Sequence, residues 1–259
     1  MHEHWLEIAR EAANAAADVI RHYYGRNLDI ETKADESPVT IADREAEHAI
    51  RSVIANACPD HAFLGEESGA SGNADAEYRW LVDPIDGTKS FVRRQPFFST
   101  QIALMHEGRV IVGVSMAPAF GEEAWATLDG GAFLDGEPIH VSDVNSVSAA
   151  SLSVGNITSL AKDREAWSRY GSLVQDVNRV RGYGDFHHYH LLARGAIDIV
   201  VESDLNILDV AALSLIIEEA GGTFTTLSGN GLHENMRSVL ATNGRLHAEI
   251  LQHFQWVER

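Results

Sequence analysis

The sequence predicts an α/β fold in which helices and sheets stack in layers within one domain of two lobes. Three observations along the chain support this prediction. Two helical segments come first, short apolar runs separated by glycine turns follow, and strands then alternate with helices to the C-terminal end. The sequence contains neither GxGxxG nor GxxxxGK[ST], so it does not indicate a nucleotide-binding fold built on those loops.

The N-terminal segment predicts two amphipathic helices. Apolar residues recur at helical spacing from Trp5 to Tyr23, and Gly25 ends this first pattern. A second helix is expected to begin near Ile41 and to stop before Pro59. The segments "AFLGEES" and "YRWLVDP" then predict two strands, each of which ends in acidic residues.

The middle of the chain, from Phe98 to Val141, predicts an antiparallel meander because its apolar runs alternate with glycine turns. The stretch "VSDVNSVSAAS" is polar and small, and it separates a lobe of residues 1–143 from a lobe of residues 149–259. Beyond it we expect strands at "ASLSVG", "RVRGYG", "AIDIVVE", "GTFTTL" and "SVLATN". The expected helices lie near 161–176, from Phe186 onward, over 210–220 and at the C-terminal end.

The charge balance limits the classes of partner. The 259 residues include 38 acidic and 20 basic residues, for a net charge of -18, which argues against nucleic acid or an anionic membrane as the main partner. The single cysteine, Cys58, cannot form an internal disulfide, so we expect a reducing, cytoplasmic location. No signal peptide is apparent, and no apolar run approaches the ~18 residues of a membrane span.

Acidic residues stand at the ends of several predicted elements, in four short segments. They are Asp43 after "PVTIA", Glu66 and Glu67 after "FLG", Asp83 and Asp86 in "DPIDGT", and Asp209 in "NILDVAA". Taken singly, each has a structural explanation. Asp43 can form a capping box with Thr40, Asp86 and Asp209 can cap helices, and the glutamates can lie in a solvated loop.

Taken together, these acids indicate a metal site. Carboxylates that converge at neighbouring strand ends would raise one another's pKa and destabilise the fold unless a cation lay between them. Mg²⁺ prefers a few carboxylates, water and phosphate oxygens as its ligands. The Gly87-Thr88 turn opens a predicted helix, and the N–H groups at a helix N-terminus can bind an anion. The pattern therefore predicts a phosphate site that contains divalent metal.

The same residues carry a resemblance to a known family. "SPVTIAD", "GEES", "LVDPIDGTKSF", "ESDLNILDVAAL" and "EAGG" resemble, in order and spacing, the motifs of the inositol monophosphatase family. Members of that family are Mg²⁺-dependent, lithium-sensitive phosphatases. The resemblance implies an αβαβα five-layer sandwich and a homodimer.

The resemblance also implies roles for individual residues. Glu66, Asp83 and the carbonyl of Ile85 would hold a first Mg²⁺. Asp83, Asp86 and Asp209 would hold a second, and Glu66 with waters a third, which gives two to three ions per site. Glu67 would lie just outside this ligand set.

The resemblance assigns the remaining catalytic roles to Asp43 and to the turn that follows the metal ligands. Thr88 and Asp43 would orient and deprotonate the attacking water, and the amides of Gly87 and Thr88 would hold phosphate. Leu208 stands where the family usually has tryptophan, before Asp209. Because the acid itself is present, we expect altered packing rather than lost chemistry.

The segment "RVRGYGDFHHYH" bears on the substrate. Inositol phosphatases of this family carry small residues where this chain has Asp185 and Phe186. Asp185 can be an N-cap for the helix that follows, or it can join Glu202 in binding an ammonium group of the substrate. L-Histidinol phosphate carries an ammonium group, together with an imidazole that suits an aromatic neighbour such as Phe186. "YGDF" also resembles the histidinol-phosphate phosphatase branch of the family.

Several alternatives remain open. Gly184, Asp185, Phe186, Glu202 and Asp209 are the candidate substrate contacts, and they are compatible with inositol-1-phosphate or with a broad range of sugar phosphates. No basic cluster indicates a second phosphate. Some family members are partners of the transcription machinery, which is a non-catalytic alternative. The histidines at 187, 188 and 190 are expected on the helix surface and in the core rather than as metal ligands.

Overall fold

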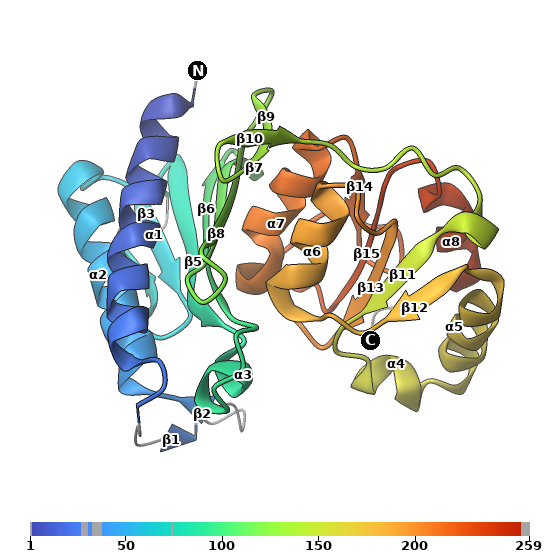
Figure 1. Ribbon diagram of the computed structural model, residues 1–259. Helices are drawn as coiled ribbons and strands as arrows, with labels where there is room; N and C mark the ends of the chain where they lie inside the picture. The colour runs from blue at the N-terminus through green and yellow to red at the C-terminus, as the bar shows by residue number, and fades with distance from the viewer. Residues whose placement is uncertain (1, 27–30, 33–37, 74, 255–259) are drawn as a thin grey trace.

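Helical layers and β-sheets alternate across the molecule (Figure 1). The computed structural model describes residues 2–26, 31–32, 38–73 and 75–254. Its helices are α1 (Glu3–Tyr23), α2 (Ile41–Ala57), α3 (Thr88–Val92), α4 (Thr158–Lys162), α5 (Arg164–Asp176), α6 (Asp185–Ala193), α7 (Ile207–Glu219), α8 (His247–Phe254) and the 3₁₀ turn η1 (Val147–Ala149).

The larger sheet contains eight strands in the order β10-β9-β8-β7-β6-β5-β3-β4. Its strands are β3 (Ala62–Gly65), β4 (Gly69–Ser71), β5 (Tyr78–Asp86), β6 (Ser99–His106), β7 (Arg109–Ala117), β8 (Glu122–Thr127), β9 (Gly131–Leu134) and β10 (Glu137–Ile139). Strands β6 to β10 pair antiparallel with their neighbours in sequence, which confirms the predicted meander. Strands β3 and β5 are parallel, so their C-terminal ends lie at the same edge.

The smaller sheet contains five strands in the order β12-β11-β13-β15-β14. They are β11 (Ser151–Val154), β12 (Arg179–Arg181), β13 (Ile199–Ser203), β14 (Thr223–Thr225) and β15 (Ser238–Thr242). A separate pair, β1 (Glu31–Thr32) and β2 (Pro38–Val39), lies near α3. All five strands of the smaller sheet lie where the sequence predicts them.

The layers follow the predicted αβαβα order. Helices α1 and α2 cover one face of the larger sheet, α6 and α7 lie between the two sheets, and α4, α5 and α8 cover the smaller sheet (Figure 1). Helix α7 is apolar on nearly every side, as expected for a helix packed between two sheets. It approaches β7 so closely that a Cβ on Gly113 would lie 2.6 Å from the carbonyl oxygen of Ala212.

Two helix boundaries differ from the sequence prediction. The helix expected near 161–176 is two helices, because Asp163 is extended and its side chain accepts the N–H groups of Glu165 and Ala166 to start α5. The helix expected over 210–220 begins earlier, at Ile207, because the Asn206 side chain caps it. The outer ends of the two predicted lobes, at residue 1 and residues 255–259, lie outside the described part of the chain. Within that part, no helix is long and apolar enough to cross a membrane.

Candidate active site

Asp83 and Asp86 lie on β5, on either side of an irregularity in its pairing with β6. Asp83 is opposite Gln101 and Asp86 is opposite Ser99, so three steps along β5 match two steps along β6. Side chains alternate between faces along a regular strand, and residues three apart would point to opposite faces. The extra residue of the bulge brings both carboxylates to the same side of the sheet.

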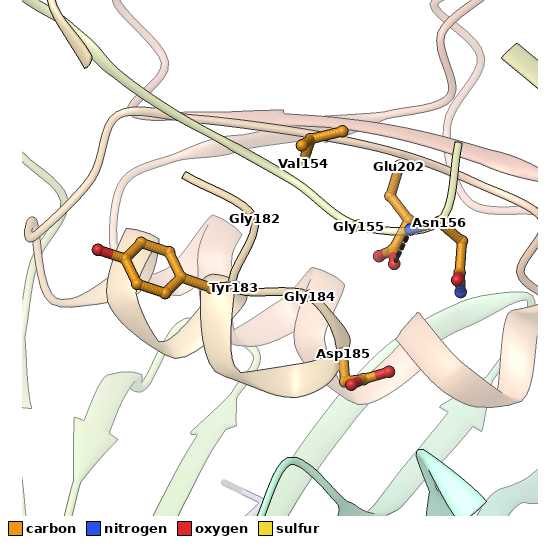
Figure 2. A pocket seen from close by; sticks show the side chains of 8 residues that line it. All are labelled: Val154, Gly155, Asn156, Gly182, Tyr183, Gly184, Asp185 and Glu202. Carbon is orange, nitrogen blue, oxygen red and sulfur yellow. Dashed lines mark hydrogen bonds between the residues drawn. The ribbon is translucent and has the colours of Figure 1, made fainter. Parts of the chain in front are cut away.

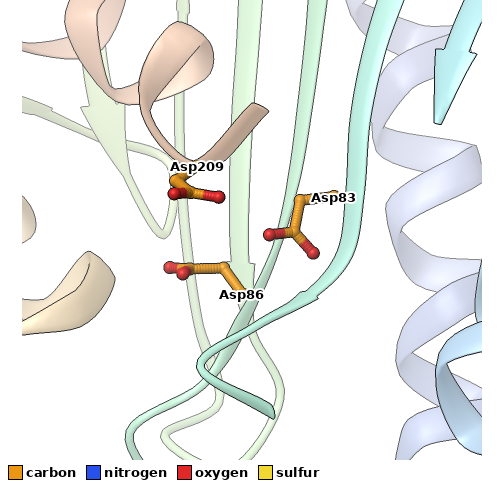
Figure 3. Close-up of side chains that lie close together, drawn as sticks. All are labelled: Asp83, Asp86 and Asp209. Atoms are coloured by element: carbon orange, nitrogen blue, oxygen red, sulfur yellow. The ribbon is translucent and has the colours of Figure 1, made fainter. Parts of the chain in front are cut away.

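Asp209 completes this cluster from the N-terminus of α7. One carboxylate oxygen from each of Asp83, Asp86 and Asp209 lies within 4.8 Å of the others, and Figure 3 shows the three side chains pointing toward one another. Asp209 also accepts the N–H and the Nδ2 of Asn206, at 2.8 and 2.9 Å, in the capping box that starts α7. The helix start thus fixes the carboxylate that faces β5.

Burial raises the pKa of Asp83, Asp86 and Asp209. For Asp83 burial is the largest cause, and the charges of the neighbouring carboxylates add to it. Burial likewise raises the pKa of Asp209 to about 7, although the backbone hydrogen bond from Asn206 opposes the rise. Buried carboxylates that hold their protons this strongly favour a cation as a partner in the ionised state. The donor set therefore fits an oxygen-coordinated divalent metal.

Glu66 and Glu67 follow β3, at the edge where β5 ends. The N–H of Glu66 donates to the carbonyl oxygen of Val82 at 3.1 Å, which holds the turn beside Asp83. The side chains of Glu66 and Asp83 are hydrogen-bonded, and the charge of Glu66 contributes to the raised pKa of Asp83. The structure therefore brings Glu66 into the cluster, as the parallel pairing of β3 and β5 requires.

Asp43, Thr88 and Ile85 meet beside the acidic cluster. The Thr88 hydroxyl lies 3.2 Å from Asp43 Oδ1 and 3.0 Å from the carbonyl oxygen of Ile85, so it can donate to either. Asp43 Oδ2 accepts the N–H and the hydroxyl of Thr40, which confirms the predicted capping box. Burial raises the pKa of Asp43, and these hydrogen bonds oppose the rise. One oxygen of Asp43 thus takes part in the cap of α2, and the other faces Thr88.

Gly87 is required at the turn after the cluster. Its backbone is left-handed, with a φ of 85°, and a Cβ would lie 2.6 Å from the carbonyl oxygen of Phe97. Gly87 is the N-cap residue of α3, so the interpretation of Asp86 as a helix cap is wrong. Asp209 is not the N-cap of α7 either, because Asn206 occupies that position.

A cavity of about 330 Å³ opens between β11, β13 and the start of α6. Its lining includes Asn156, Tyr183, Asp185 and Glu202 (Figure 2). A smaller adjoining cavity shares the asparagine and both acids with it and is also lined by Asp86 and Asp209. The two cavities therefore join the acidic cluster to a second pair of carboxylates. Among the described residues that line them, none is lysine or arginine.

Glu202 is held by hydrogen bonds from three sides. Its Oε2 accepts the Tyr189 hydroxyl at 2.7 Å and lies 3.1 Å from His188 Nε2. Its Oε1 accepts the N–H of Asn156 at 3.1 Å. His188 Nδ1 lies 3.3 Å from the Ser153 hydroxyl, so the neutral imidazole can accept at Nδ1 and donate from Nε2 to the carboxylate.

Asp185 is the first residue of α6 and has a left-handed backbone, with a φ of 46°. Gly184, which also lines the cavity, is the N-cap residue, and no side chain caps this helix, so the N-cap interpretation of Asp185 is wrong. Burial raises the pKa of Asp185 to about 6, and the charge of Glu202 adds to the rise. Strained backbone at a cavity wall is typical of a functional position.

Phe186 does not contact the cavity, and the prediction that it contacts the substrate is corrected. Its side chain is fully buried and packs edge-on against Phe120 and His190, at centroid distances of 5.7 and 5.0 Å. Tyr183 is the aromatic residue of the cavity wall. Sequence reasoning missed Tyr183, although it stands in the same "YGDF" run.

The residues that hold Glu202 were not predicted from the sequence either. His188 and Tyr189 are buried in α6, and Asn156 follows β11, which pairs with β13 in parallel register. The histidines His188 and His190 are core residues, as predicted, and His187 is half-buried. Leu208 is buried in the core that surrounds α7, so an apolar side chain packs at the position where the resemblance implies tryptophan.

Comparison with known proteins decides the family. The model of the inositol monophosphatase family matches residues 1–259. The chain belongs to the inositol monophosphatase family. Its class is therefore that of a phosphoric monoester hydrolase, and the acidic cluster agrees with the metal dependence of the family.

Individual relatives cover almost the whole chain. The chain is 42% identical to a histidinol-phosphatase of Mycobacterium tuberculosis over 255 residues, covering 95% of this chain and 96% of that one. It is 39% identical to a histidinol-phosphatase of Streptomyces coelicolor over 263 residues, covering 95% of each. The structure of an inositol monophosphatase from Zymomonas mobilis matches with a TM-score of 0.86 and 32% identity, covering 98% of this chain and 99% of that one.

Proposed function

We propose that this member of the inositol monophosphatase family is a Mg²⁺-dependent phosphatase of L-histidinol phosphate, which yields L-histidinol and phosphate. The observation that carries the proposal is the pair of carboxylates, Asp185 and Glu202, in a cavity that adjoins the acidic cluster. The relatives named histidinol-phosphatase support it.

The acidic cluster is the proposed site of two to three Mg²⁺ ions. Asp83, Asp86 and Asp209 would hold one ion, and Glu66, Asp83 and the carbonyl of Ile85 another. Glu66 with waters would hold the third. Bound there, Mg²⁺ would neutralise charge on the phosphoryl and leaving oxygens and lower the pKa of a bound water. The N–H groups of Gly87 and Thr88, at the first turn of α3, would hold the phosphate oxygens.

The proton of the attacking water would pass to the Thr88 and Asp43 pair. Thr88 Oγ1 accepts the water proton while its own proton moves to Asp43 Oδ1, which lies 3.2 Å away. Burial raises the pKa of Asp43, so its carboxylate is a better proton acceptor than an exposed aspartate. The water oxygen would attack phosphorus as the bond from phosphorus to the alcohol oxygen on the opposite side breaks, and the leaving alcohol oxygen would take up a proton from solvent water.

The carboxylate pair would recognise the ammonium group of the alcohol. Burial and then the charge of Glu202 raise the pKa of Asp185, and a cation bound between the two side chains would favour the ionised form of Asp185. A charge-assisted hydrogen bond to an ammonium contributes about 1.5–3 kcal/mol. Tyr183 supplies an aromatic wall for the imidazole. Inositol-1-phosphate and other sugar phosphates carry hydroxyl groups at that place and would gain less from two acids.

The test combines an isosteric variant with a substrate analogue. Asn tolerates a left-handed backbone as Asp does, so Asp185→Asn removes the charge without adding strain. We expect kcat/KM for histidinol phosphate to fall about ten- to a hundred-fold in the variant. The des-amino analogue, 3-(imidazol-4-yl)propyl phosphate, lacks the ammonium and should be hydrolysed equally by both proteins.

A matched control variant separates charge from folding. Asp163 caps α5 and lines neither cavity, so Asp163→Asn changes the same chemical group outside them. It should leave both substrates unaffected. Equal losses on histidinol phosphate and on the des-amino analogue in Asp185→Asn would refute the ammonium contact. Higher wild-type kcat/KM for inositol-1-phosphate than for histidinol phosphate would refute the substrate assignment itself.

Two further properties stay predictions of the family resemblance. We expect a homodimer in solution, which analytical ultracentrifugation would test. We also expect inhibition by Li⁺ at concentrations on the order of millimolar, because Li⁺ would replace the ion held by Asp83, Asp86 and Asp209.

A further inference from the structure

Glu47 is a buried carboxylate of α2 that has no part in the proposed proton transfer or substrate contacts. Only 3% of the residue is exposed. Its Oε2 accepts the N–H of Glu67 at 2.7 Å, and its Oε1 accepts the N–H of Ser68 at 2.8 Å. Both carboxylate oxygens are therefore bonded to the turn that follows β3.

This turn is fixed from two sides. The N–H of Glu66 donates to the carbonyl oxygen of Val82 on β5, and the next two N–H groups donate to Glu47 on α2. Strand β5 carries Asp83, with which the Glu66 side chain is hydrogen-bonded. Because three consecutive N–H groups are bound, the backbone of Glu66 has little freedom to move its carboxylate away from the cluster.

Space for the Glu47 carboxylate depends on Gly65. A Cβ at this position would lie 2.4 Å from Oε2, 2.5 Å from Cδ and 2.8 Å from Oε1 of Glu47. Any other residue at 65 would push the carboxylate off the turn. Glu47 also lies one helical turn after Asp43, on the same side of α2, so one helix face presents both acids to the site.

We propose that Glu47 is a positioning residue that sets the metal affinity of the site by fixing the turn that carries Glu66. The proposal rests on the metal role proposed above for Glu66. A carboxylate suits this task because it offers an acceptor to each N–H group. A glutamine offers one oxygen and one NH₂, and the NH₂ would face an N–H group without accepting it. Groups that orient metal ligands typically change metal affinity 10- to 100-fold when they are replaced.

Glu219, at the C-terminal end of α7, offers a matched control. Glu219 accepts the N–H groups of Asp129 and Gly131, both at 2.8 Å, so it binds a turn through two oxygens as Glu47 does. That turn joins β8 and β9 and carries no proposed metal ligand. Glu47→Gln and Glu219→Gln therefore remove the same kind of contact, one at the site and one far from it.

The measurement is Mn²⁺ binding to substrate-free protein by isothermal titration and by EPR, together with Tm. We expect Glu47→Gln to weaken Mn²⁺ binding at least about ten-fold, while Glu219→Gln binds as the wild type does. The Tm should fall by similar amounts in the two variants. The Mg²⁺ concentration that gives half-maximal hydrolysis should rise only in Glu47→Gln, and saturating Mg²⁺ should restore most of kcat.

Unchanged Mn²⁺ affinity in Glu47→Gln, or an equal loss in Glu219→Gln, would overturn the proposal and leave Glu47 a structural residue. If Glu47→Gln does not fold, Gly65→Ala serves instead, because the added Cβ displaces the Glu47 carboxylate without removing it. Unchanged Mn²⁺ affinity in Gly65→Ala would also overturn the proposal. Mn²⁺ binding by the wild type distinguishes failure of this proposal from failure of the proposed metal site. Absence of Mn²⁺ binding in the wild type would refute the metal site, whereas equal binding by wild type and variant refutes only the role of Glu47.

Discussion

The two sheets use the same arrangement of a glycine and a buried glutamate, with different consequences. At the end of β3, Gly65 leaves room for Glu47, which binds the N–H groups of the next turn. After β11, Gly155 leaves room for Glu202, which binds the N–H of Asn156. In each case a carboxylate from a neighbouring element occupies the space of a missing side chain and holds the loop that follows a strand.

The two glutamates differ in what else they contact. Both oxygens of Glu47 are engaged by backbone, so this residue supports the metal side of the site. Glu202 receives its other bonds from the side chains of Tyr189 and His188 and still lines the cavity. Under the proposed function, one packing arrangement would thus serve support in the larger sheet and substrate recognition in the smaller one. The predictions that follow test this division, from the largest expected effect to the smallest.

Loss of a cluster ligand should affect every substrate. Asp83→Asn removes charge at the centre of the acidic cluster, and we expect kcat to fall at least ~100-fold on histidinol phosphate and inositol-1-phosphate alike. Chelator should abolish wild-type activity, and Mg²⁺ should restore it. Steady-state phosphate release measures both effects. Activity that survives both the substitution and the chelator would contradict the metal role of the cluster.

Crowding of Glu202 should affect one substrate more than the other. In Gly155→Ala the new Cβ would lie 2.0 Å from Glu202 Oε1, so the carboxylate must leave its position. We expect kcat/KM for histidinol phosphate to fall about ten- to a hundred-fold, with Mn²⁺ affinity unchanged. Gly65→Ala should show the reverse pattern, with weaker Mn²⁺ binding and equal losses on all substrates. If both variants lose the same property, the division between support and recognition is wrong.

Metal-free protein should become less stable as the pH rises. Asp209 holds its proton with a pKa of about 7 in the fold, whereas an unfolded aspartate has a pKa of about 3.9. Between these values the folded state binds more protons than the unfolded state, so the free energy of unfolding falls as pH increases from about 4 to 7. Thermal melts in chelator should show this fall, and Asp209→Asn should reduce it. Added Mg²⁺ should raise the Tm most at the neutral end. A metal-free Tm that rises toward neutral pH would contradict the assignment.

The smallest effect is expected at Tyr189. Tyr189→Phe removes one of the hydrogen bonds to Glu202 and leaves the apolar packing of the ring in place. A single bond of this kind contributes about 0.5–1.5 kcal/mol, so we expect a loss of roughly two- to ten-fold in kcat/KM for histidinol phosphate. Inositol-1-phosphate should change less. Kinetics on both substrates provide the measurement, and a uniform loss would assign Tyr189 to general packing.

Much of the acidic cluster could be predicted because its signals are local. Acids that directly follow apolar strands are expected at a sheet edge, and the motif around "DPIDGT" identifies the family. The bulge between Asp83 and Asp86 could not be predicted, because it depends on how β5 registers with β6. Sequence spacing alone leaves these two side chains on opposite faces.

The hydrogen bonds of Glu47 and Glu202 join residues far apart in the chain, so they could not be predicted from the sequence. Glu47 binds a turn twenty residues further along the chain, and Glu202 is held by α6 and by the loop after β11. No pattern in the sequence marks these contacts. The N-cap interpretation of Asp185 failed for a related reason, since the left-handed backbone at Gly184 and Asp185 starts α6 without a side-chain cap.

Helix α7 has a further consequence for how the molecule holds together. Asp209 reaches the cluster from the layer between the sheets, whereas Asp83 and Asp86 belong to the larger sheet. An ion bound by all three therefore bridges the larger sheet and the helix layer against which the smaller sheet packs. Since binding can occur only when these layers are docked, part of the binding free energy opposes their separation. The ion would thus act as a cross-link between segments far apart in the chain. Its removal would weaken the contact between the larger sheet and the helix layer before either sheet unfolds.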